Sequence, residues 1–124
     1  MTGGEAERLV ARYFEMWNTG DRSIAEEILA PDWVDHAHPE VDGPPDVARA
    51  VERVRAARPG LRFQIDATLN NGPLVAAVGR VGDGPADGDP PAELIWLIRT
   101  HGGRMAEMWT YRAADRPTAG RAGP

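Results

Sequence analysis

Two of the three histidines of the chain lie one residue apart in a segment rich in acids, residues 32–46. His36 and His38 have acids on both sides, Asp35 before them and Glu40 after them. Three kinds of chemistry fit this pattern: a metal site, a general base in a pocket, or a polar strand end that only meets water. The choice among them depends on the elements that hold the segment.

A metal site is the weakest of the three interpretations. Two histidines one residue apart on a strand point to the same side, and Glu40 or Asp42 could add an oxygen ligand. Pro39, however, breaks the strand where a further ligand should follow, and the remaining histidine, His101, stands beside a Gly-Gly turn. The chain has no cysteine, which excludes thiolate sites, disulfides and cysteine nucleophiles. We therefore expect no metal and no cofactor.

His36 is the stronger candidate of the pair for acid-base chemistry. An imidazole titrates near neutrality, so in a cavity it can take a proton from a substrate or return one. The alternative is a structural hydrogen bond across a sheet. His38 is expected at the surface. Asp35 has the opposite strand parity to His36, so it is expected to face the other way and to be structural.

Glu107 alternates with Trp109 and Tyr111 along the last segment with strand character. If that face lines a cavity, aromatic walls would raise the pKa of the Glu107 carboxyl into the range of a catalytic acid or base. If it faces solvent, Glu107 would pair with Arg99 across a hairpin. Arg99 itself could anchor an oxyanion or a carboxylate, although surface pairing is the commoner fate of an arginine.

Four tryptophans are many for a chain of 124 residues. Core packing accounts for them, and so does a flat, aromatic-lined pocket for a hydrophobic ligand; both can hold. Ser23 is the only serine and is expected to cap a helix, which excludes serine hydrolysis. The candidate ligand-contacting residues are Tyr13, Trp17, Trp33, Trp96, Arg99, Trp109 and Tyr111.

Hydrophobic periodicity predicts the elements that must position these residues. Apolar residues recur at helical spacing in residues 5–17, briefly in the segment that follows, and again in residues 46–58. A short extended piece, residues 32–36, stands between the second and third helices. From Leu61 the period changes to two, which predicts four antiparallel strands, the last two joined by a tight turn at Gly102–Gly103. Helices followed by antiparallel strands predict an α+β fold.

Composition and charge are those of one ordinary globular domain, with 42% hydrophobic and 27% charged residues. The net charge is -5 and the arginines are scattered, so no electrostatic footprint for nucleic acid is expected. No stretch is long and apolar enough for a signal peptide or a membrane span. We expect a domain of residues 1–112, a flexible tail of residues 113–124, and a cytoplasmic location, which the lack of cysteine fits.

Five segments, in this order of elements, resemble the SnoaL-like polyketide cyclases of the nuclear transport factor 2 superfamily. Ketosteroid isomerase and limonene epoxide hydrolase share that fold. The resemblance implies a cone-shaped barrel, in which a curved antiparallel sheet wraps around a long N-terminal helix, with three helices in all. It also implies a homodimer through the outer face of the sheet. The segments, which cover nearly the whole chain, are YFEMWNTGD, LAPDWVDHAHP, GPPDVARAV, RPGLRFQI and GGRMAEMW.

The chemistry implied by the resemblance is cofactor-free acid-base catalysis on a hydrophobic, polyketide-type substrate of natural-product biosynthesis. The reaction would be an intramolecular cyclisation, an isomerisation or a dehydration of that substrate. In this interpretation His36, near the position of the catalytic carboxylate of ketosteroid isomerase, is the general base or acid. Glu107 is its partner across the cavity, and Tyr111 or Arg99 donates to the developing enolate oxygen.

Two alternatives stay open beside that interpretation. An epoxide hydrolase-like reaction would need a carboxylate to activate water, and inward-facing acids are scarce. Family members usually carry an aspartate four residues beyond the tryptophan of the last hairpin, where this chain has Ala113. A non-catalytic module that binds a small ligand or assembles as a dimer is therefore the second hypothesis. In each case the expected partners are a small hydrophobic molecule and a second copy of the chain, with no nucleic acid and no membrane.

Overall fold

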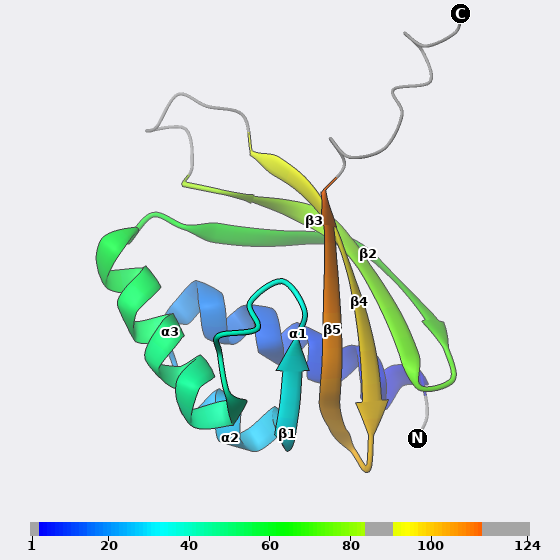
Figure 1. Cartoon of the computed structure of the whole chain (residues 1–124). Coiled ribbons are helices and arrows are strands. Elements are labelled where there is room, and N and C mark those ends of the chain that lie inside the picture. Colours follow the sequence, from blue (N-terminus) through cyan, green and yellow to red (C-terminus); the bar gives the residue numbers. More distant parts are fainter. Residues whose placement is uncertain (1–2, 84–90, 113–124) are drawn as a thin grey trace, which may run out of the picture.

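The computed structural model of the chain describes residues 3–83 and 91–112, which form three helices and five strands (Figure 1). The expected tail, residues 113–124, lies outside this part. No helix within the described ranges is both long and apolar enough to cross a bilayer. In chain order the elements are α1 (Gly3–Thr19), α2 (Ile24–Ile28), β1 (Leu29–Asp35), α3 (Gly43–Ala57), β2 (Arg62–Asn71), β3 (Leu74–Gly82), β4 (Ala92–His101) and β5 (Arg104–Arg112).

The long helix α1 is amphipathic, as its spacing of apolar residues predicts. Val10, Phe14 and Met16 are buried on one side, whereas Arg8 and Glu15 are exposed on the other. The helix closes at Gly20, whose positive φ of 81° lets its amide donate a hydrogen bond to the carbonyl of Met16. Burial of this apolar stripe holds α1 against the sheet.

The strands form one sheet in the order β1-β5-β4-β3-β2. Strands β2 to β5 make the expected antiparallel meander, with a tight turn at Gly102 and Gly103, both at positive φ. The expectation of a purely antiparallel sheet is wrong for the short first strand. β1 pairs with β5 in parallel, with Asp35 opposite Met108. No hairpin connects these two strands, so nothing local fixes their relative direction. The sheet is therefore mixed, curved and open, with β1 and β2 at its edges.

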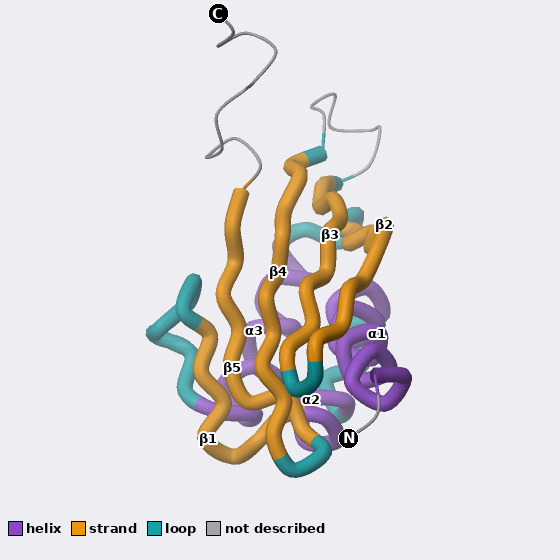
Figure 2. The backbone as a smooth tube through the Cα atoms, turned by 90° about the vertical axis from the view of Figure 1, so that its right-hand side faces the viewer, coloured by secondary structure: helices purple, strands orange, loops and turns teal. Residues whose placement is uncertain are grey.

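The three helices cover one face of the sheet, and Figure 2 looks onto the other face with the helices behind the strands. We call the side turned to the helices the inner face and the other side the outer face. Strand β4 shows the alternation clearly: Trp96 and Ile98 are buried on the inner face, and Leu97 and Arg99 are half-buried on the outer face. The core of the protein therefore lies between the inner face and the helices.

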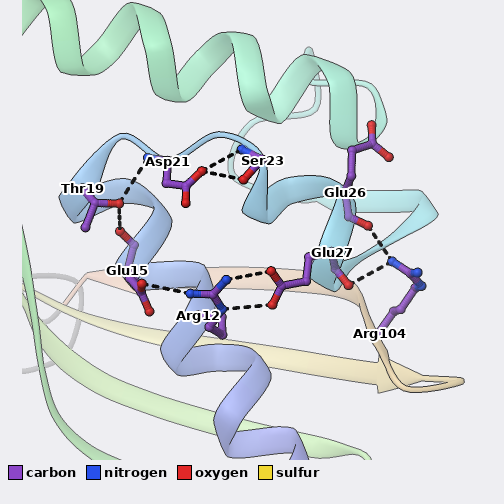
Figure 3. Close-up of polar contacts among 8 residues, drawn as sticks. All are labelled: Arg12, Glu15, Thr19, Asp21, Ser23, Glu26, Glu27 and Arg104. Carbon is purple, nitrogen blue, oxygen red and sulfur yellow. Dashed lines mark hydrogen bonds and ion pairs between the residues drawn. The ribbon is translucent and has the colours of Figure 1, made fainter.

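A network of charged groups fixes the start of β1 against its neighbours (Figure 3). The guanidinium of Arg12 on α1 donates to both carboxylate oxygens of Glu27 at 3.0 and 2.6 Å, which raises the pKa of Arg12 above its usual range. Arg104, at the start of β5, donates to the backbone carbonyls of Glu26 and Glu27 at 2.7 and 3.1 Å. These carbonyls end α2, so the arginine acts as its C-terminal cap. The link connects α1 and β5 to the segment that leads into β1.

Candidate functional site

The sheet separates the candidate residues into two groups. The inner group lies on α1 and on inner-face positions of the strands, and the outer group lies on the opposite face. The structure thus does not bring them together around one pocket. The inner group is Tyr13, Trp17, Trp33 and Trp96. The outer group is His36, Arg99, Glu107, Trp109 and Tyr111.

The outer group contains a chain of three polar residues. Nε2 of His36 lies 2.6 Å from Oε2 of Glu107, and Nε of Arg99 donates to Oε1 of the same carboxylate at 2.8 Å. The imidazole stacks on Trp109, with 4.8 Å between ring centroids and 8° between planes. Val34 precedes His36 on the same face and is 44% exposed. His36 and Glu107 are therefore in direct contact on the outer face and not opposed across an interior space.

The electrostatics of the outer group follow from this contact. The hydrogen bond with His36, and then the one with Arg99, hold the pKa of the Glu107 carboxyl below its usual range. Glu107 is thus an ionised acceptor at neutral pH, and not the carboxyl with a raised pKa that a cavity would produce. Of the two alternatives considered for it, pairing with Arg99 is the one observed. The side chain of His36 is 42% exposed.

Six aromatic side chains form one connected cluster between α1 and the inner face. Its centroid distances run from 4.7 Å for Phe14 and Trp96 to 6.5 Å for Tyr13 and Trp17. Tyr13 links the two sides of the cluster, because its ring contacts Phe14 at 5.2 Å and Trp33 on β1 at 6.0 Å. The members of this aromatic cluster are Tyr13, Phe14, Trp17, Trp33, Phe63 and Trp96.

Asp35 brings an acid to the edge of the aromatic cluster. It follows Trp33 on the inner face of β1 and is only 7% exposed. Burial raises the pKa of its carboxyl, although Oδ1 accepts a hydrogen bond from the backbone N–H of Ala37 at 3.0 Å, which opposes the rise. Burial also raises the pKa of Tyr13, and the negative charge of Asp35 raises it further. The charge of Asp35 therefore acts on the Tyr13 hydroxyl, and the pKa of each group is raised.

The indole nitrogen of Trp33 is the second polar feature of this region. Among the described residues, Nε1 of Trp33 is the buried side-chain polar atom that has no hydrogen-bond partner. The residue as a whole is 3% exposed. Native structures satisfy nearly all buried donors, so this buried indole N–H without a protein acceptor is unusual.

The other polar candidates of the sequence do not form a site. His38 is exposed, as expected, and its Nδ1 lies 3.5 Å from Glu40. Over residues 3–83 and 91–112, no group of three or more histidines and acids is arranged to hold a metal ion.

An open groove of about 610 Å³ lies between α1 and β2. Polar groups that line it form hydrogen bonds with each other, as the Thr68 hydroxyl does with the Glu7 carboxylate.

Asp35 is a buried acid for which the sequence predicts only a structural role. Strand parity separates it from His36, and the structure places Asp35 on the inner face and His36 on the outer face. The sequence does contain a signal for the burial of Asp35, because Trp33 lies two residues before it and therefore on the same face of the strand. A tryptophan on an amphipathic strand usually faces the core, so the acid on its face is buried as well.

A mixed sheet curved around a helix, with an acid and an aromatic cluster between the layers, defines an α+β fold. Residues 10–108 match the model of the SnoaL-like domain, and the chain therefore belongs to the SnoaL-like family. No match is found among curated proteins.

Solved structures with the same fold come from several bacteria. A candidate polyketide cyclase from Bacillus cereus ATCC 10987 is 20% identical, with a TM-score of 0.75, over 89% of this chain and 75% of that one. IdmH from Streptomyces antibioticus, also a candidate polyketide cyclase, is 24% identical with a TM-score of 0.65, over 88% and 92%. A candidate SnoaL-like isomerase from Agrobacterium tumefaciens is 20% identical with a TM-score of 0.70, over 88% and 97%. At these identities the likeness establishes the fold alone.

Proposed function

We propose that the protein is a cofactor-free enzyme that moves a proton at a carbon next to a carbonyl group of a hydrophobic substrate. The observation that carries the proposal is Asp35: a carboxyl buried on the inner face, with a raised pKa, beside an aromatic cluster. Catalytic acids and bases need a pKa near the working pH, and burial is one way to obtain it. The names of the similar structures, polyketide cyclase and isomerase, describe this type of chemistry.

The proposed reaction begins with the Asp35 carboxylate taking a proton from the α-carbon. The electron pair of the broken C–H bond moves to the carbonyl oxygen, and the Tyr13 hydroxyl stabilises this developing enolate by donating a hydrogen bond. The enolate carbon then attacks a second carbonyl, which closes a ring, and the alkoxide that forms takes the proton from Asp35. In a substrate with an adjacent carbon–carbon double bond, the conjugated enolate instead takes that proton at its far carbon, which isomerises the substrate. The aromatic cluster excludes water during the exchange of protons.

A second candidate for the base is His36, which has one specific observation in its favour. Its Nε2 binds a carboxylate that Arg99 holds in turn, an arrangement that orients an imidazole and leaves Nδ1 to accept a proton. Stacking on Trp109 holds the ring in place. The roles of His36 and Glu107 as catalytic partners, with Arg99 or Tyr111 as oxyanion donor, therefore remain a proposal for the outer face.

Proton exchange on a simple ketone distinguishes the two bases without knowledge of the natural substrate. The protein is mixed with 2-tetralone in D₂O, and loss of the α-proton signals is followed by NMR. We expect Asp35→Asn to lose the protein-dependent exchange at least tenfold, since the amide cannot take up the proton. His36→Gln is the matched control and should retain it. Exchange that survives in Asp35→Asn and disappears in His36→Gln would move the reaction to the outer face.

The alternative function, a non-catalytic ligand-binding or dimeric module, has support from the outer face. Val34, Val78 and Tyr111 are exposed there, around the half-buried Leu97. Exposed apolar residues that share one face favour association, and a homodimer through this face is part of the proposal. Sedimentation velocity tests it: Val78→Arg should shift a dimer toward monomer, and an unchanged sedimentation coefficient would contradict it.

A further inference from the structure

The chemistry of the inner group restricts the kind of ligand that it can hold. Asp35 and Thr100 are the buried polar residues of the described chain, and Tyr13 adds a buried hydroxyl. All 14 cationic side chains of the protein are arginines, and none of those that the structure describes is buried. The inner group, together with Asp35 beside it, therefore offers a carboxyl group and neutral hydrogen-bond donors, with no buried arginine among the described residues.

A charged ligand group fits this environment poorly. A carboxylate or phosphate beside Asp35 would meet a second negative charge in a region of low dielectric, with no arginine to compensate it. A ketone or ester carbonyl carries no charge and accepts hydrogen bonds through its oxygen. It therefore matches the donors that are present.

The indole N–H of Trp33 is the donor that still lacks an acceptor. Trp33 and Asp35 alternate on the inner face of β1, so both side chains leave the strand on the same side. The Tyr13 ring faces Trp33 from α1 at 6.0 Å. A carbonyl oxygen that reaches Trp33 thus has the Tyr13 ring beside it and the Asp35 carboxyl along the same strand.

We propose that Nε1–H of Trp33 donates a hydrogen bond to the carbonyl oxygen of the ligand, and that the inner group thereby selects uncharged carbonyl compounds over carboxylates. This inference rests on the proposed function, because it concerns the same site. The donor is closed off from solvent. The ring in contact with Trp33 is that of Tyr13, so the proposal requires this ring to shift when a ligand binds.

Three bicyclic probes test the inference: 2-tetralone, tetralin, which has the same rings but no oxygen, and 2-naphthoate, which is an anion. Binding is measured at pH 7 by NMR of the ¹⁵N-labelled indole groups, whose Trp33 signal is identified with Trp33→Phe. We expect 2-tetralone to move the Trp33 N–H signal downfield, as formation of a hydrogen bond does. Tetralin should leave it near its original position, and 2-naphthoate should bind at least tenfold more weakly than 2-tetralone.

Two variants separate hydrogen bonding from packing. Trp33→Phe should weaken 2-tetralone about tenfold or more, the effect of one lost hydrogen bond to a ligand, and leave tetralin almost unchanged. Trp96→Phe removes an equally buried indole, 3% exposed in each case, and should change the two ligands alike. Equal weakening of both ligands by Trp33→Phe, an unmoved indole signal when 2-tetralone binds, or tight binding of 2-naphthoate would overturn the inference.

A failure of the inference about Trp33 can be told apart from a failure of the proposed function of Asp35. If Asp35→Asn abolishes proton exchange while Trp33→Phe binds 2-tetralone normally, the role of Trp33 is refuted and the role of Asp35 stands. If Trp33 discriminates between ketone and hydrocarbon while Asp35→Asn still catalyses exchange, the base is elsewhere and the donor stands. If none of the three probes affects the indole signals of the aromatic cluster, both proposals are refuted.

Discussion

The unpartnered indole of Trp33 makes a quantitative prediction about stability. Trp33 and Trp96 are equally buried, at 3% exposure, and both belong to the aromatic cluster. Replacement of either by phenylalanine removes apolar contact and leaves a small cavity, which together cost about 1–2 kcal/mol. At Trp33 the same change also removes a buried donor without an acceptor, whose burial costs about 1–3 kcal/mol. The two effects oppose each other at Trp33 only.

We therefore expect Trp33→Phe to be close to wild type in free energy of unfolding, and about 1 kcal/mol or more above Trp96→Phe. The measurement is urea unfolding of the three proteins followed by circular dichroism, since tryptophan fluorescence differs among them. Equal m values are required for the comparison, because they show that the same surface is exposed on unfolding. Equal losses in the two variants, or a larger loss in Trp33→Phe, would refute the reasoning and indicate that the indole N–H has an acceptor.

Two further predictions concern the backbone and the pH dependence of stability. Gly79→Ala would place a methyl group 2.1 Å from the carbonyl oxygen of Gln64, so it should destabilise the protein by about 1–3 kcal/mol or more. In the control variant Gly4→Ala the added methyl group meets open space on α1, so this variant should be more stable than wild type by up to about 1 kcal/mol. Thermal unfolding compares the two variants. Similar melting temperatures would contradict the close approach of Gly79 to the Gln64 backbone. Because burial raises the pKa of Asp35, the unfolded chain releases this proton at a lower pH than the folded protein. Wild type should thus lose stability relative to Asp35→Asn as pH rises from about 4 toward neutrality. Because the pKa of Glu107 is lowered, its contribution to stability should depend on pH in the opposite sense: the stability of wild type relative to Glu107→Gln should fall as pH falls. Urea unfolding at several pH values tests both residues. The same pH dependence of the stability difference for Asp35→Asn and Glu107→Gln would contradict these assignments.

Much of the fold follows from local patterns in the sequence. The apolar spacing of α1, the change of period at Leu61 and the Gly102–Gly103 turn each depend on residues close in the chain, and each agrees with the structure. The parallel pairing of β1 with β5 does not have such a signal. It joins Asp35 to Met108, more than half the chain apart, and depends on how the helices pack.

The candidate site was also predictable only where it depends on local sequence patterns. Parity alone shows that Asp35 and His36 leave β1 on opposite sides. Which side is the interior depends on the neighbours of the strand, and these are set by tertiary structure. The contact of His36 with Glu107 similarly results from the β1–β5 register, so sequence reasoning named both residues but not their arrangement.

The central claim is that Asp35 is an acid or base held beside the ligand by the inner face of the sheet. Its most direct test is a ¹³C NMR titration of the side-chain carboxyls, with Asp35 assigned by comparison with Asp35→Asn, in the presence and absence of 2-tetralone. The account predicts that Asp35 titrates above the ordinary aspartate value of about 3.9, and that 2-tetralone shifts its midpoint. An Asp35 carboxyl that titrates with the exposed acids, and does not respond to bound 2-tetralone, would contradict it.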